Sequence, residues 1–373
     1  MKIFFPIGAF YPSQIGGPCN TVYWHTTALK NKDLQVDIVT TSLGIQPDSV
    51  PLNRSLEMEC GKVFYGEKTG ISWEVFKEIR RGIEEADVIH LNGLFNTLCI
   101  CSFFYSKIFY PKKKIIWTVR GELNDTALGF SSLKKQIILY FYKKLSSNVI
   151  FHGTSTKEMS EIATTFPASK LVQLPNFIQP HDKLQLPYDK NFLYVGRIHP
   201  IKALDKLIEG FAASKDFRDS DFKLIIVGTH EERYQKYDAA LKSKIIQLNL
   251  QDKIEWKGHL KGLEKEQAYA KAYALLLVSE TENFGNVVVE SLNQGTPVIA
   301  SKGTPWSILE QYNCGYHISN EPKAIANKID EMINVKEEQY LAMRKNACKL
   351  IEEEFDVKHH IGKWIKIYND EKE

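Results

Sequence analysis

Two carboxylates eight residues apart could bind hydroxyl-rich ligands in the C-terminal half of the chain. Glu282 follows a strand-like run, and Glu290 lies within a helix expected over residues 286–293. We expect Asn283 to cap this helix and Gly285 to permit close backbone approach. A helix N-terminus suits a diphosphate or sugar hydroxyls, because its N–H groups are unpaired. Each carboxylate can accept two hydrogen bonds from a vicinal diol, so one could hold a hexose and the other a ribose.

A structural alternative treats Glu282 as a loop charge and Glu290 as part of a solvated helix face. The neighbours of Glu290 weaken this alternative, because residues 287–289 are all valine and residue 292 is leucine. An unpaired carboxylate on a mostly apolar helix is costly.

Two cations lie near the start of another helix, expected over residues 203–213. Arg197 comes just after a strand-like run, and Lys202 opens the helix. The helix dipole disfavours cations at this end. The placement is explained if an anion lies between Arg197 and Lys202; the alternative is a solvated cationic edge.

The elements that must position these residues alternate between short β-rich runs and helices. Such alternation predicts βαβ units and mainly parallel sheets. The expected strands and helices lie at residues 3–7, 20–29, 36–41, 87–91, 114–119, 131–145 and 148–152, and again from 192 onward at 192–195, 203–213, 223–227, 235–248, 254–256, 264–272, 273–278, 286–293, 297–300 and 322–333. Proline-containing breaks between 174 and 187 separate the two series, so we predict two Rossmann-like domains. Their boundaries are 1–175 and 176–350, with a C-terminal helix at 351–373 packing back on the first domain.

The segment at residues 279–300 resembles the E-x7-E signature of family-4 retaining glycosyltransferases, which have the GT-B fold. Phe284-Gly285, Glu290 and the run Gly295-Thr296-Pro297-Val298 carry the likeness together with Ala300. It extends over nearly the whole chain and is most specific over residues 190–303. The resemblance implies an α/β fold with two parallel-sheet domains facing a central cleft. It also implies a nucleoside-diphosphate sugar as donor, with no cofactor and no metal.

The resemblance further implies roles for particular residues. Arg197 and Lys202 would hold the donor diphosphate and stabilise the leaving group, and Glu282 would position the donor sugar. The remaining donor-binding residues would be Gly16, Gly17, Gly228, His259, Leu260, Asn283, Phe284, Gly285, Asn286 and Glu290. A plain turn at Gly16-Gly17 and a surface location for His259 are the alternatives.

The acceptor side departs from the family pattern. Arg120 stands where many relatives carry a histidine, followed closely by Glu122, and this resembles a variant of polysaccharide-building members. His90 and Asn92 end another strand and are the other acceptor-binding candidates. A buried, hydrogen-bonded histidine is the alternative for His90.

The composition narrows the class of protein and its cellular compartment. The chain has 373 residues, 43% hydrophobic and 25% charged, with a net charge of +3, which is too small for a dedicated nucleic-acid binder. Residues 1–175 are the more basic half, with 20 Lys and Arg against 15 Asp and Glu. Six scattered cysteines, no signal peptide and no long apolar run lead us to expect a cytosolic protein. Basic and aromatic residues at 110–114 and 133–144 suggest peripheral contact with the cytoplasmic membrane face; a helix with solvated lysines is the alternative.

The expected reaction moves a sugar to a hydroxyl of a glycan or lipid-linked saccharide, with retention and without a metal. The expected pathway is surface polysaccharide biosynthesis: capsule, exopolysaccharide or lipopolysaccharide. The alternatives are a nucleotide-sugar epimerase or a phosphorylase on the same fold, and a non-catalytic sugar-nucleotide-binding subunit.

Overall fold

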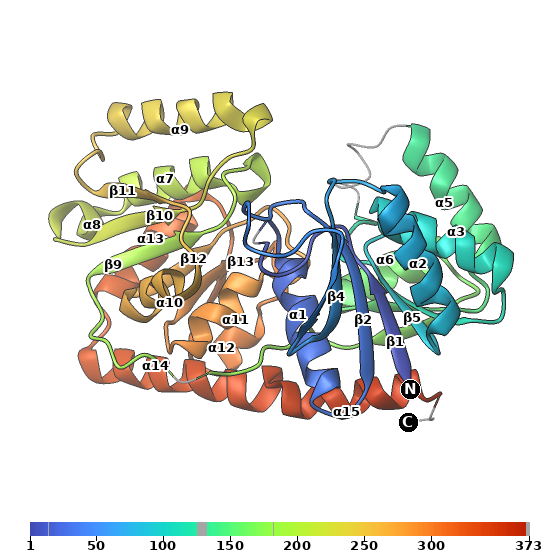
Figure 1. The fold of residues 1–373 in the computed structure, drawn as a ribbon. Coiled ribbons are helices and arrows are strands. Elements are labelled where there is room, and N and C mark those ends of the chain that lie inside the picture. Colours follow the sequence, from blue (N-terminus) through green and yellow to red (C-terminus); the bar gives the residue numbers. More distant parts are fainter. Residues whose placement is uncertain (14, 125–132, 182, 371–373) are drawn as a thin grey trace. The chain divides into compact units, whose positions relative to one another are not determined.

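The computed structural model describes residues 1–373 except 14, 125–132, 182 and 371–373. The chain forms two compact units (Figure 1). Unit 1 contains Met1–Gln179 and Val357–Glu373, and unit 2 contains Pro180–Asp356. These divisions lie close to the expected boundaries at residues 175 and 350.

Unit 1 is built on an eight-stranded sheet with the order β3-β4-β2-β1-β5-β6-β7-β8. The strands are β1 (Lys2–Pro6), β2 (Gln35–Thr41), β3 (Ser55–Met58), β4 (Gly61–Gly66), β5 (Val88–Asn92), β6 (Lys114–Thr118), β7 (Val149–Gly153) and β8 (Lys170–Gln173). Neighbours pair in parallel except β3, which runs antiparallel to β4 at the edge. The inner strands are almost wholly buried, as expected of a parallel sheet covered on both faces.

Helices cover the two faces of this sheet. They are α1 (Gly17–Lys30), α2 (Trp73–Glu85), α3 (Thr97–Phe109), α5 (Leu133–Leu145), α6 (Thr156–Thr165) and α15 (Val357–Tyr368). Side chains of α1 and α15 share one apolar core with β1, whereas α2, α3, α5 and α6 contribute to a second core (Figure 1). The C-terminal helix α15 therefore packs within unit 1, in contact with α1.

Unit 2 has a six-stranded parallel sheet with the order β11-β10-β9-β12-β13-β14. The strands are β9 (Asn191–Val195), β10 (Lys223–Val227), β11 (Ile254–Gly258), β12 (Ala274–Leu277), β13 (Val298–Ser301) and β14 (Gly315–Ile318). Counted along unit 2, this is the doubly wound order 3-2-1-4-5-6. The helical segments are η1 (Pro200–Lys202), α7 (Leu204–Ala213), α8 (Lys215–Asp219), η2 (Glu232–Tyr234), α9 (Gln235–Gln247), α10 (Gly262–Lys271), α11 (Asn286–Asn293), α12 (Ile308–Gln311), α13 (Pro322–Ile333) and α14 (Glu337–Leu350).

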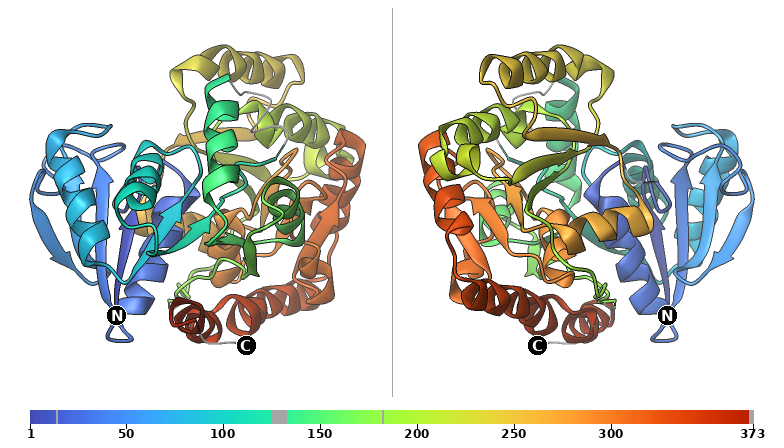
Figure 2. Two further views of the ribbon diagram at one scale, coloured as in Figure 1. Left: turned by 90° about the vertical axis from the view of Figure 1, so that its right-hand side faces the viewer. Right: turned by 90° about the vertical axis from the view of Figure 1, so that its left-hand side faces the viewer.

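A nearly continuous helical run ends the chain. The helix α14 passes into a π-helical turn (Ile351–Phe355) and then into α15, and this run is coloured red in Figure 2. Asp356 alone separates the π-helical turn from α15.

The α/β fold class with two parallel-sheet domains is confirmed. The expectations leave out β3, β4, α2, α3, α6, β8, α8, α12 and β14. The sequence of α3 is apolar on nearly all sides, so it lacks the polar stripe by which an amphipathic helix is detected. Residues 131 and 132 of the helix expected over 131–145 lie outside the described residues.

Candidate active site

The strand order of unit 2 reverses direction between β9 and β12. Ligands of open α/β sheets bind at this point, outside the carboxyl ends of the strands. The loops after β9 and β12 are hydrogen-bonded to each other here, because Glu280 N donates to the Ile201 carbonyl at 2.8 Å. The second loop is also held by Glu282 N, which donates to the Gly303 carbonyl at 3.0 Å.

Lys202 and Glu282 meet at this switch point. The Lys202 ammonium forms an ion pair with the Glu282 carboxylate, and their side chains are 15% and 18% exposed. The Ser279 hydroxyl donates a second hydrogen bond to the same carboxylate at 3.3 Å. Two predicted site residues from loops 80 positions apart are thus brought into direct contact.

Lys202 lies at the end of the short helix η1, whereas its sequence position predicts that it opens the helix at 203–213. The His199 Nδ1 atom accepts a hydrogen bond from Ile201 N at 3.0 Å and caps η1. Ala203 then adopts a left-handed conformation with φ 51°, and α7 begins only at Leu204. The helix expected over residues 203–213 therefore begins one residue later, at Leu204, and the sharp turn at Ala203 separates it from η1.

Arg197 lies in the same loop but pairs with a different carboxylate. Its guanidinium is 3.1 Å from Glu231 Oε1, and the two side chains are 53% and 44% exposed. The Tyr194 hydroxyl donates to the Arg197 carbonyl at 2.8 Å and holds the backbone in place. A half-exposed ion pair contributes little to stability, so the Arg197 side chain is available for another anion.

Glu290 is held inside unit 2 by two partners that are not among the predicted site residues. Lys265 Nζ lies 3.0 Å from its carboxylate, and the buried Tyr269 hydroxyl donates to it at 2.7 Å. Burial and the Glu290 charge raise the pKa of Tyr269 well above its usual value, so the hydroxyl remains a donor. With an exposed fraction of 11%, Glu290 does not lie on a solvated helix face.

The N-terminus of α11 differs from expectation. Gly285, rather than Asn283, occupies the N-cap position, with φ 83° and no side-chain capping bond. This left-handed conformation favours glycine, and an added Cβ would lie 2.8 Å from the Leu277 side chain. The next residue, Asn286, begins the helix.

Phe284 anchors the loop that leads into α11. Its ring is buried beside Trp306 and Phe355, at centroid distances of 5.1 and 5.8 Å. The Trp306 Nε1–H donates to the Phe284 carbonyl. The Phe284 side chain therefore packs in the interior, and only its backbone can face a ligand.

The other predicted donor residues of unit 2 follow β10 and β11. Gly228 N donates to the Gly258 carbonyl at 2.7 Å, and a Cβ on Gly228 would lie 1.8 Å from the Gly196 carbonyl oxygen. Packing alone therefore requires this glycine.

His259 and Leu260 follow β11. His259 is exposed and Leu260 is half-buried. Desolvation, with the charges of Lys261 and Lys265, lowers the pKa of His259. Their roles toward a base remain predictions.

The glycine pair of unit 1 lies at the N-terminus of α1. Gly16 is the N-cap and Gly17 the first helical residue. An added Cβ on Gly16 would meet only Pro18, at 3.6 Å, which is ordinary van der Waals contact. Packing within unit 1 therefore does not demand glycine at position 16, and the role of the pair toward a ligand remains a prediction.

The predicted acceptor residues of unit 1 separate into two groups. Asn92 Oδ1 accepts from Arg120 Nη2 at 2.7 Å and from Nε at 3.2 Å, so these two residues act together. Glu122 instead accepts from the backbone N–H groups of Leu94 and Phe95 and holds the loop after β5. Burial raises the pKa of Glu122.

His90 is buried within unit 1 with both ring nitrogens hydrogen-bonded. Nδ1 lies 2.6 Å from the Tyr368 hydroxyl, and Nε2 lies 2.8 Å from Thr118 Oγ1. This geometry favours the structural alternative for His90. His25 and His152 are also buried in unit 1, and both contact Trp364 of α15, which lies more than 200 residues away in sequence.

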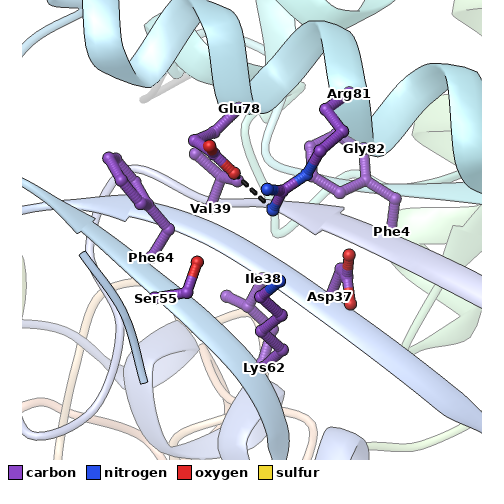
Figure 3. A pocket seen from close by; sticks show the side chains of 10 residues that line it. All are labelled: Phe4, Asp37, Ile38, Val39, Ser55, Lys62, Phe64, Glu78, Arg81 and Gly82. Carbon is purple, nitrogen blue, oxygen red and sulfur yellow. Dashed lines mark ion pairs between the residues drawn. The ribbon is translucent and has the colours of Figure 1, made fainter. Parts of the chain in front are cut away.

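A small pocket of unit 1 contains none of the predicted site residues. Figure 3 shows it between α2 and the strands β2 and β4, with an ion pair between Glu78 and Arg81 at its rim. Asp37 is also engaged, since Lys2 Nζ lies 2.9 Å away. The pocket is a packing gap rather than a candidate active site.

Comparison with known proteins places the site of unit 2 in a family. Residues 178–350 match the family model "Glycosyl transferases group 1". These residues form a group 1 glycosyltransferase domain. The group 1 domain contains Arg197, Lys202, Glu282 and Glu290, the charged residues described above.

Similar proteins extend the likeness to the whole chain. An uncharacterized glycosyltransferase of Methanocaldococcus jannaschii is 28% identical over 90% of each chain. The O-antigen chain mannosyltransferase RfbU of Salmonella typhimurium is 31% identical over 38% of each chain. The structure of Anabaena HepE in complex with UDP-glucose superposes with a TM-score of 0.74, at 18% identity over 99% of each chain. At this identity the superposition shows the fold, and it agrees with the GT-B class.

Among the described residues, none of the helices combines the length and the apolar character that crossing a bilayer requires.

Proposed function

We propose that the protein is a retaining glycosyltransferase that moves a sugar from a nucleoside-diphosphate sugar to an acceptor hydroxyl. The observation that carries the proposal is the meeting of Lys202 and Glu282 at the switch point of the group 1 domain. A cation and a carboxylate side by side match a donor that carries a diphosphate and sugar hydroxyls on adjacent atoms.

In this proposal Lys202 and Arg197 bind the donor diphosphate. Each of them now pairs with a carboxylate, Glu282 and Glu231 respectively. Donor binding would replace these carboxylates with phosphate oxygens and free Glu282 to accept hydroxyl hydrogen bonds from the sugar. Glu290, held by Lys265 and Tyr269, would accept from the ribose hydroxyls.

The chemical step breaks the bond between the anomeric carbon and the phosphate oxygen. A bond to the acceptor oxygen forms on the same face of the sugar, and the acceptor proton passes to the leaving phosphate. Lys202 and Arg197 would stabilise the charge that develops on that phosphate, so we propose that no metal ion or cofactor is needed. Glu282 would position the sugar and would not attack it.

We further propose that the acceptor is a glycan or lipid-linked saccharide used for surface polysaccharide, and that a hexose is transferred. The similarity to an O-antigen chain mannosyltransferase supports this pathway. Unit 1 would bind the acceptor through Asn92 and Arg120.

Peripheral contact with a membrane surface is part of the same proposal. The exposed side of α5 carries Leu133, Ile137, Tyr140 and Phe141, which are 71%, 49%, 59% and 47% exposed. Four lysines and no acidic residue lie in α5. An exposed apolar and cationic helix face suits an anionic lipid surface. Co-sedimentation with vesicles of anionic and of neutral lipid tests it: equal binding to both, or binding unchanged by Phe141→Asp, would contradict it.

A donor screen tests the transferase proposal. The purified protein is mixed with a panel of nucleotide sugars in the presence of EDTA, and its thermal unfolding is followed. We expect one donor to raise the midpoint, and Lys202→Met to abolish that rise. A rise that requires added divalent cation would contradict metal independence, and no rise with any donor would count against the transferase.

Two alternatives remain distinguishable. An epimerase would convert the donor in the absence of any acceptor and would release no nucleoside diphosphate. A non-catalytic subunit would bind donor without releasing nucleoside diphosphate when acceptors are supplied. Chromatography of the nucleotide products separates the three cases.

A further inference from the structure

Arg120 is a largely buried cation whose hydrogen-bond partners are all neutral. Its guanidinium donates to Asn92 Oδ1, to Asn176 Oδ1 at 3.1 Å and to Thr21 Oγ1 at 3.5 Å. Within the part of the chain that the structure describes, none of the ion pairs involves Arg120. Burial lowers the pKa of Arg120 to about 10, so the side chain is still protonated at neutral pH.

The two carboxylates that influence Arg120 are occupied elsewhere. Glu158 accepts from Gly121 N at 2.6 Å and from Thr154 N at 2.7 Å. Glu122 accepts from the amides that follow β5. Both shape the backbone on either side of Arg120, which itself has φ 64°, but neither reaches its guanidinium as an ion-pair partner.

The histidines around Arg120 add no charge to compensate it. His25 and His152 line a small pocket with Arg120, Asn176, Phe177 and Trp364. Desolvation, with the positive charge of Arg120, lowers the pKa of both histidines, that of His152 to about 3. At neutral pH the pocket therefore has polar and aromatic walls and one positive charge.

A buried cation without a counter-ion is costly, and a chain that needed only a structural link there would be served by a neutral amide. The planar guanidinium is instead suited to bind a carboxylate or phosphate through two parallel hydrogen bonds. Arg120 also follows the carboxyl end of β6, beside Asn92 at the end of β5, which is the edge of a parallel sheet where ligands bind.

We infer that Arg120 binds an anionic group of the acceptor, so that the acceptor is a hydroxyl compound bearing a phosphate or carboxylate. This inference rests on the proposed function in taking the bound anion to be part of the acceptor. The anion site itself is formed by residues of unit 1 alone. Asn92 and Asn176 orient the guanidinium, and Thr21 at the start of α1 lies beside the anion.

The test uses glycerol 3-phosphate, glycerate and glycerol as probes of similar size. Each is titrated calorimetrically into the full-length protein with excess UDP present, so that phosphate does not report on the donor site. We expect at least one of the two anions to bind and glycerol not to bind. The stronger of the two anions identifies the anionic group as phosphate or carboxylate.

Three variants assign the binding to Arg120. Arg120→Gln should lower the affinity for the anion at least tenfold, and Arg120→Lys should retain part of that affinity. Arg80→Gln, at an exposed position, is the matched control. Equal anion binding by wild type and Arg120→Gln would overturn the inference, as would equal binding of glycerol and the anions by the wild type.

A measurement on the wild type covers the case in which Arg120→Gln does not fold. The ring protons of the histidines are followed by NMR during the anion titration. Both rings line the pocket with Arg120, so a bound anion should shift the ring-proton resonances of His25 and His152 at constant neutral pH, and unchanged resonances would overturn the inference. UDP binding is measured in parallel. Absence of UDP binding would contradict the transferase proposal and leave the anion result standing, whereas absence of anion binding would overturn the inference and leave the transferase proposal standing.

Discussion

The two sheets have the same strand order around their centres, but the cations at their carboxyl edges differ in whether a carboxylate compensates them. At the edge of unit 2, Lys202 pairs with Glu282, Arg197 with Glu231, and Lys265 with Glu290. At the edge of unit 1, the hydrogen-bond partners of Arg120 among the described residues are neutral oxygens, and the histidines near it are uncharged at neutral pH. The shared topology therefore sets where a ligand can bind, and the side chains decide which kind.

The difference has a physical consequence for binding. Compensated pairs are stable without a ligand and must exchange partners when a donor arrives. The buried Arg120 cation is destabilising until an anion arrives, so an anion should stabilise unit 1 without first displacing a carboxylate partner. Three predictions test this contrast.

The largest effect is expected at the paired edge. Lys202→Met removes the cation that would neutralise the leaving diphosphate, so we expect kcat/KM to fall about 100- to 1,000-fold, as for removal of one preorganised electrostatic group. Lys206→Met is the control, because Lys206 pairs with Glu280 at 3.0 Å and Glu321 at 3.1 Å close by. Similar losses in both variants would mean that charge anywhere in this region matters, and not the Lys202–Glu282 pair.

An intermediate effect is expected at the uncompensated edge, in the pH dependence of stability. The folded-state pKa of His152 lies at about 3, below its usual value of 6.5, because the ring is desolvated. The unfolded chain therefore binds more protons in this range, so stability is full above pH 6.5 and falls as the pH falls toward 3. Each such histidine contributes about 1.4 kcal/mol per pH unit.

Urea unfolding of the full-length protein at pH 7.5, 6.5 and 5.5 measures this slope, the change of the free energy of unfolding with pH. His152→Gln should reduce it by the contribution of one histidine, and the exposed His359→Gln should not. An unchanged slope in His152→Gln would contradict the assignment of neutral histidines around Arg120.

The smallest effect is expected where the paired edge has a redundant partner. Tyr269→Phe removes one hydrogen bond to Glu290 but leaves Lys265 in place, so donor affinity should fall only a few-fold, in keeping with about 1 kcal/mol for one hydrogen bond. Glu290→Gln should lower donor affinity more strongly. Calorimetric titration of UDP compares the two, and equal losses would indicate that Tyr269 contacts the ligand itself.

Much of the candidate site could be predicted from local sequence. The helix bearing Glu290 spans the expected residues 286–293, and the strands before Arg197 and Glu282 lie where their apolar runs indicate. Helix and strand periodicity depend on neighbours within a few residues, and an eight-residue spacing across one loop and one helix is similarly local. The capping of α11 was mistaken because Asn283 has the side chain of a cap, whereas the backbone places the left-handed Gly285 there.

The amino-acid sequence alone thus determined the alternating elements, the two domains and the charged residues that end their strands. The tertiary structure decided which of these charges are paired. Glu290 meets Tyr269 and Lys265 because α10 packs beside α11, and the histidines beside Arg120 are neutral because α15 returns to cover α1. Pairing and desolvation depend on which faces come together, and a one-dimensional pattern shows that a face is apolar without showing what it meets.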